Sequence, residues 1–62
     1  MRILDLLARI DDDNDVKVVF GELLIEQGTC GYVWNKLNYF DMCNYHVSKI
    51  SINHECIVIE VI

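Results

Sequence analysis

Two cysteines and two histidines near the end of the sequence are of the types that bind zinc. Cys43 and His46 are separated by two residues, and His54 and Cys56 by one. Zinc binds four thiolate or imidazole ligands in a tetrahedron, so the two pairs could hold one ion. Structural zinc sites more often use C-x2-C or H-x3-H pairs on glycine-rich knuckles, which are missing here. Buried cysteines and surface histidines beside a turn are the commoner arrangement, and we therefore expect no metal and no cofactor.

Cys43 and His46 could also pair as a nucleophile and its base. Such a thiol needs an electropositive setting that lowers its pKa, and a third group that orients the base. The sequence has ten acidic and five basic residues, and no orienting group is evident. The glycines at 28 and 31 are not followed by the G-K-[ST] of a phosphate-binding loop. The sequence therefore predicts a protein that is not an enzyme.

The acidic run from Asp11 to Asp15 has the residue types of a calcium loop. An EF-hand that starts at Asp11 needs glycine at its sixth position and glutamate at its twelfth. The sequence has Val16 and Glu22 there, so only the glutamate fits. We interpret the run as a solvated turn.

Charge and apolar run length restrict the partners. A formal net charge of −5 repels nucleic-acid phosphates, and the basic residues are scattered, so direct nucleic-acid binding is not expected. Apolar runs such as Ile57-Val58-Ile59 are far shorter than the roughly 20 residues of a membrane-spanning helix. Three cysteines cannot all pair within one chain, and no signal peptide precedes them, which favours a reducing cytoplasm.

The elements that would position these side chains follow from hydrophobic periodicity. The i, i+3, i+4, i+7 spacing of one apolar helix stripe predicts a helix over about residues 2–10; the stripe consists of Ile3, Leu6, Leu7 and Ile10. The acidic run should end this helix. A later apolar spacing at Val33, Leu37 and Phe40 predicts a short helix near 32–37, followed by an irregular link to about residue 45.

Two hairpins are predicted from β-branched, alternating segments. Residues 16–20 end at Gly21 and are followed by a strand over 23–25. Residues 47–52 and 55–62 are joined by Asn53-His54, a tight connection because asparagine tolerates positive φ. The sequence thus predicts one α+β domain over residues 1–62, a small antiparallel sheet with an N-terminal helix, in the order α-β-β-α-β-β.

The last predicted strand is apolar on both faces. Alternation places Cys56, Val58 and Ile62 on one face, and Ile57, Ile59 and Val61 on the other. One face can pack on the N-terminal helix, whereas the other needs a cover. A chain of 62 residues buries only about 60% of the surface that its unfolded form exposes. In this chain 53% of the residues are hydrophobic. We expect a homodimer or another partner to supply the cover, with an intramolecular three-layer core as the alternative.

Aromatic residues are dense between the two hairpins. Tryptophan and tyrosine are enriched at interface hot spots, although they could equally cap a thin core. Together with one face of the last strand they form the predicted interface set: Tyr32, Trp34, Tyr39, Phe40, Tyr45, Cys56, Val58 and Ile62.

The order of segments resembles very short proteins of phages and prophages of Gram-positive bacteria. The resemblance covers almost the full chain: Ile3-Leu4-Asp5-Leu6-Leu7, the turn Asp11 to Asp15, Val16-Lys17-Val18, Glu26-Gln27-Gly28-Thr29, Val47 to Ile52, and Ile57 to Val61. The segment from Gly31 to Tyr45 departs from the family's more polar middle.

Some similar small proteins inhibit bacterial immunity, among them anti-CRISPR proteins and the inhibitors of the Hachiman defence system. The resemblance implies a viral accessory protein in the host bacterial cytoplasm. We expect an anti-defence inhibitor, a homodimer that binds and blocks a host defence protein. The alternative is a phage or prophage accessory protein that binds a phage component and has no role in immunity.

Overall fold

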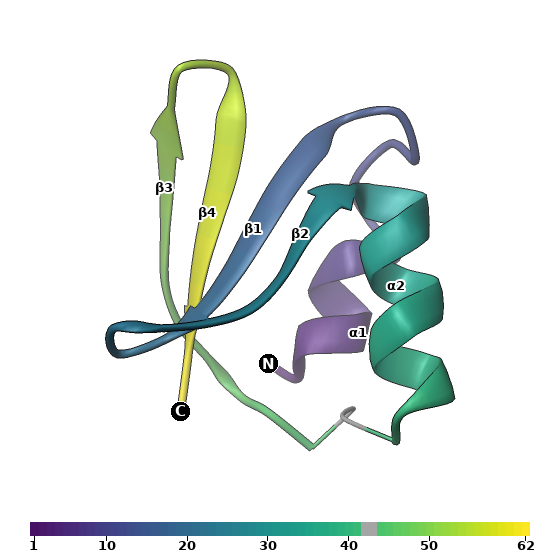
Figure 1. The fold of residues 1–62 in the computed structure, drawn as a ribbon, viewed down its shortest axis with the longest axis vertical. Coiled ribbons are helices and arrows are strands. Elements are labelled where there is room, and N and C mark those ends of the chain that lie inside the picture. The colour runs from purple at the N-terminus through teal and green to yellow at the C-terminus, as the bar shows by residue number, and fades with distance from the viewer. Residues whose placement is uncertain (42–43) are drawn as a thin grey trace.

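The computed structural model describes residues 1–41 and 44–62. Its elements are α1 (Ile3–Leu7), β1 (Asp15–Phe20), β2 (Leu23–Thr29), α2 (Cys30–Tyr39), β3 (Val47–Asn53) and β4 (Cys56–Val61) (Figure 1). The predicted α+β class and the order α-β-β-α-β-β are confirmed. Neither described helix has the length and apolar character to cross a membrane.

The four strands form one sheet in the order β2-β1-β4-β3. Pairing is antiparallel within each hairpin, as predicted, but the central strands β1 and β4 are parallel, with Val16 beside Ile57. The sheet is therefore mixed, and the prediction of an antiparallel sheet is corrected at this junction. The reason is the helix between the hairpins: α2 carries the chain back along the sheet, so β3 runs in the direction of β2 and β4 in that of β1.

The first helix is shorter than predicted, and the second is longer. After Leu7 the chain tightens, because the amides of Arg9 and Ile10 donate to carbonyls only three residues back. The apolar stripe nevertheless faces inward as predicted, with Leu6 and Ile10 packed against the core. Helix α2 begins before residue 32 because the Thr29 hydroxyl accepts a hydrogen bond from the Tyr32 amide at 3.3 Å.

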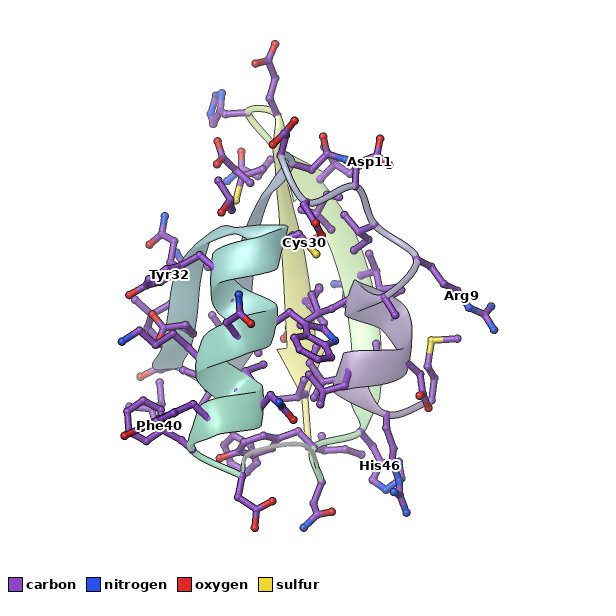
Figure 2. The ribbon with its side chains drawn as sticks, turned by 90° about the vertical axis from the view of Figure 1, so that its right-hand side faces the viewer. Arg9, Asp11, Cys30, Tyr32, Phe40 and His46 are labelled. Atoms are coloured by element: carbon purple, nitrogen blue, oxygen red, sulfur yellow. The ribbon has the colours of Figure 1, made fainter. Side chains whose placement is uncertain are left out.

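Both helices lie over the same face of the sheet, and Figure 2 shows them in front of the strands. Between these two layers lies a core without any buried polar side chain among the described residues: Ile3, Leu7, Val16, Val18, Cys30, Val33, Leu37, Ile59 and Val61. Because strand side chains alternate, Val58 and Glu60 lie on the face of β4 opposite Ile59. Neither helix covers that face, where Val58 is half-buried, so the three-layer alternative is wrong.

The turn between β3 and β4 lies one residue later than predicted. Asn53 pairs with Cys56 in the ladder, and the connection is His54-Glu55, with φ values of 51° and 66°. Positive φ at both central residues is the signature of a type I′ turn, whose twist matches that of the flanking strands. This register pairs Ile52 with Ile57 on the helix side of the sheet, and a shift by one residue would reverse both side chains.

Candidate recognition surface

Helix α2 is apolar on both sides, although only one side is buried. Val33 and Leu37 are fully buried in the core. The opposite flank carries Tyr32 and Tyr39, which are 47% and 81% exposed, and Phe40 follows at the end of the helix, 55% exposed. Figure 2 shows Tyr32 and Phe40 projecting from the side of α2 that is turned away from α1. The helix thus presents aromatic rings to solvent.

Lys36 lies among these rings, and we name Tyr32, Lys36, Tyr39 and Phe40 the outer α2 cluster. The Lys36 Nζ atom is 5.6 Å from the centre of the Tyr32 ring and 5.8 Å from that of Phe40. An ammonium within about 6 Å of a ring centre is attracted to the face of the ring. The rings of Tyr39 and Phe40 meet edge to face, with centres 5.0 Å apart. These contacts hold four long side chains in one arrangement.

The cluster borders a hollow of about 290 Å³, lined by Tyr32, Asn35, Lys36 and Tyr39. Its walls are mostly ring carbon, with an amide and an ammonium as the polar groups. Such a hollow can take a planar or apolar side chain of a partner, while Lys36 can pair with a carboxylate.

Strand β2 positions the cluster through Gly28. This glycine has φ of +149°, and a Cβ built there would lie 2.8 Å from Cδ2 of Tyr32. The Tyr32 ring can lie against the backbone only because residue 28 has no side chain. The next residue, Thr29, caps the helix on which Tyr32 and Lys36 lie one turn apart. The segment 28–29 therefore sets both the start of α2 and the place of its first aromatic ring.

The acidic run caps the same helix with its backbone. The Asn14 carbonyl accepts from the Cys30 amide at 2.7 Å, and the Asp12 carbonyl from the Gly31 amide at 3.2 Å. Together with the Thr29 hydroxyl, these carbonyls satisfy the first three amides of α2, which have no partner within the helix. The carboxylates of residues 11–13 are exposed near its positive end. The solvated turn thus has a structural role that the sequence analysis missed.

The predicted interface residues separate into groups. Tyr32, Tyr39 and Phe40 belong to the outer α2 cluster, whereas Trp34 and Tyr45 are half-buried and pack against the core. The Tyr45 ring lies 6.0 Å from that of Phe20.

Cys56, Val58 and Ile62 do not join the aromatic cluster. Cys56 and Val58 are half-buried on the face of the sheet that the helices leave open. Ile62 is 70% exposed, and its backbone exchanges two hydrogen bonds with His46. The predicted set therefore describes separate surfaces, and the outer α2 cluster is the part of it that borders the 290 Å³ hollow.

The zinc hypothesis is not supported by the positions of its ligands. His46 immediately precedes β3, where it pairs with Arg2, and His54 lies in the turn at the other end of that strand. Residues so far apart along an extended strand cannot share one ion. Cys43 lies outside the described residues. Within residues 1–41 and 44–62, no three histidine, cysteine or acidic side chains gather closely enough to hold a metal.

Cys30 is buried at the start of α2, and its Sγ donates to the Leu7 carbonyl at 3.2 Å. Burial, and secondarily the Asp12 carboxylate, raises the pKa of this thiol. Its environment therefore keeps the sulfur protonated, the opposite of what a nucleophile needs. The thiol instead ties α2 to α1.

Sequence reasoning found the aromatic residues but missed the cation between them. The spacing of Tyr32, Lys36 and Phe40, four residues apart each time, is the signal that could have revealed it once a ten-residue helix was assumed. No protein-family model, curated protein or solved structure matches this chain.

Proposed function

We propose that this chain is a binding protein that blocks a host defence protein of bacteria, in the host cytoplasm and as a homodimer. Its contact surface is the outer α2 cluster. The observation that carries the proposal is the exposure of aromatic rings around Lys36 on a helix whose opposite side is fully buried. The role against bacterial immunity follows from the resemblance to short phage proteins.

The energetics of exposed rings favour a partner at this surface. Tyr39 and Phe40 are 81% and 55% exposed, and each Å² of apolar surface withdrawn from water contributes about 25 cal/mol. Aromatic rings lose little conformational freedom on binding, which is why they dominate hot spots. The contact of Phe40 with Lys36 and the contact between the two rings already restrict their motion. The cluster is therefore partly organised before a partner arrives.

Charge indicates the chemistry of the partner. The chain has a formal net charge of −5, which attracts a basic protein surface over a distance of about one Debye length. Lys36 is the basic residue of α2 and lies beside the hollow. We propose a partner with a basic rim around an aromatic or acidic side chain that enters the hollow. A nucleic-acid channel of a defence enzyme has such a basic rim.

The test is affinity capture with defence proteins, combined with phage challenge of cells that carry the same defence systems. Wild-type protein should retain one defence protein. It should also restore phage growth in the cells that this defence protein protects. Tyr39→Ala should weaken capture about tenfold or more, as expected for truncating a hot-spot ring. Leu23→Ala is the matched control, because Leu23 is 63% exposed on β2, outside the cluster.

Equal capture by wild type and Tyr39→Ala would refute the outer α2 cluster as the contact surface. Unchanged protection across the panel of defence systems would refute the role against immunity. Capture of a phage component in place of a host protein would support the accessory-protein alternative.

A further inference from the structure

Strand β3 forms one edge of the sheet, and its residues after Val47 are exposed. The sheet order places β4 on one side of β3 and no described strand on the other. Ile50 and Ile52 are 50% and 77% exposed, although their ladder partners Ile59 and Ile57 lie on the helix side of the sheet. The two isoleucines therefore extend the apolar side of the sheet beyond the cover of the helices.

The register determines which backbone groups this edge offers. In a two-residue hairpin the residues that flank the turn exchange both hydrogen bonds, and here these are Asn53 and Cys56. Hydrogen-bonded pairs alternate along the ladder, so Ser51 also bonds to β4. The amides and carbonyls of Ile50 and Ile52 then point away from β4, toward solvent. The free edge carries two residues with unpaired donors and acceptors.

Both edges of the sheet carry a bulge and a charged residue, which on β3 is Lys49, but the two strands carry them at different places. Strand β2 has an irregularity opposite Val18/Val19 and a glycine with φ of +149° at residue 28, and it carries charged Glu26. Bulges and charges are the usual devices that prevent a strand edge from pairing with another chain. The irregularity of β3 lies between Val47 and Lys49 and leaves the Ile50-Ser51-Ile52 segment regular and uncharged.

We propose that β3 pairs antiparallel with β3 of a second copy, about a two-fold axis at Ser51. Ile50 then lies opposite Ile52 of the second copy, and each such pair exchanges both of its backbone hydrogen bonds. The two sheets become continuous, and the isoleucines of both copies meet on the helix side.

This edge is self-complementary in hydrogen bonding, and the proposed pairing brings no like charges face to face. About the Ser51 axis, Lys49 lies opposite the uncharged Asn53 of the second copy. The inference rests on the homodimer of the proposed function and names its surface. That surface is separate from the outer α2 cluster, and it lies one strand away from Val58 and Cys56, the ladder partners of Ser51 and Asn53.

Cysteine cross-linking tests the register directly. Residues 49, 51 and 53 fall at non-hydrogen-bonded positions of the proposed pairing, where facing Cα atoms are about 4.5 Å apart, within disulfide range. In a background with Cys43 and Cys56 replaced by serine, Ser51→Cys should form a disulfide between two copies under mild oxidation. Lys49→Cys alone should not, whereas a mixture of Lys49→Cys and Asn53→Cys should.

Light scattering over a range of concentrations tests the edge without new cysteines. Ile52→Thr keeps a β-branched residue, and Ile52→Pro removes an outward amide without removing a bond to β4. Both should shift the dimer to monomer, while Leu23→Thr, a change at another exposed aliphatic residue on the β2 edge, should leave the dimer intact. Circular dichroism checks that each variant is folded.

A wild-type monomer at all concentrations would overturn the inference, as would a dimer that survives both Ile52 changes. Loss of the dimer in Leu23→Thr alone would assign it to the β2 edge and also overturn it. Tyr39→Ala should remain dimeric, so loss of target capture and loss of dimer are separate results. Target capture by a monomeric Ile52→Thr variant would leave the outer α2 cluster supported.

Discussion

Gly28 and Tyr32 lie in contact, with the tyrosine ring against the backbone of the glycine. A Cβ at residue 28 would lie 2.8 Å from Cδ2 of the ring, and the φ of +149° is one that side-chain-bearing residues rarely adopt. Gly28→Ala should therefore lower the free energy of unfolding by about 1–3 kcal/mol, as expected for a residue forced into a glycine-only conformation. Urea denaturation followed by circular dichroism measures the change.

A double-mutant cycle separates the two causes of this loss. Tyr32→Ala removes the ring, so the Gly28→Ala change should cost less in that background, while the backbone strain should remain. The same cost of Gly28→Ala with and without the ring would show that the contact between the two residues has no effect on stability.

The turn between β3 and β4 should become more stable with residues suited to it. His54 and Glu55 have positive φ, which costs side-chain-bearing residues about 1 kcal/mol or more each. The pair Asn-Gly is the preferred sequence of type I′ turns. His54→Asn with Glu55→Gly should raise the free energy of unfolding by about 1 kcal/mol, measured by urea denaturation. His54→Val should lower it, and the opposite order would contradict the turn assignment.

Thr29 should contribute through its hydroxyl. Its Oγ1 accepts from the Tyr32 amide, and loss of such a cap costs about 1 kcal/mol. Thr29→Ala should lower the free energy of unfolding by that amount, whereas Thr29→Ser should restore most of it. Thermal unfolding followed by circular dichroism is a suitable measurement. Equal midpoints for the alanine and serine variants would exclude a role for the hydroxyl.

Stability should decline in alkaline solution because of Cys30. Burial and the Asp12 carboxylate raise the pKa of this thiol above its ordinary value of 9.0 in the folded protein. Above that value the unfolded chain loses the thiol proton while the folded chain retains it, so the free energy of unfolding falls as pH rises. Below the ordinary thiol pKa both the folded and the unfolded chain keep the thiol proton, so Cys30 causes no loss of stability there. Urea denaturation between pH 7 and about pH 11 should show the decline.

Cys30→Ala provides the control for this decline, because lysines and tyrosines also titrate in the same range. The variant should lose less stability between neutral and alkaline pH than the wild type does. Identical pH profiles would mean that the thiol has no part in the effect.

The local sequence pattern predicted the two hairpins. Contacts between distant segments determined the length of α2 and the pairing of β1 with β4. The alternation that ends at Gly21 was sufficient to place the first turn, since Gly21 has φ of 61° there. The length of α2 was missed because carbonyls of Asp12 and Asn14, remote in sequence, satisfy its first amides. The parallel pairing of β1 with β4 was missed because it depends on where the α2 crossover returns the chain.

The candidate site shows the same division. Density of aromatic residues identified the correct segment, but the helical phase decides that Tyr32 faces solvent while Trp34 packs against the core. The zinc hypothesis failed because spacing along a sequence does not show that the whole of strand β3 separates His46 from His54.

The parallel junction of β1 and β4 also has a consequence for how the chain folds. Each hairpin joins neighbouring residues and can form within microseconds, but Asp15 meets Cys56 only after the segment between them, about two thirds of the chain, has been closed into a loop. The entropy of closing that long loop is lost before the central contacts compensate for it. Neither hairpin is expected to persist alone, and the rate at which native protein appears should depend on how often Val18 meets Ile59.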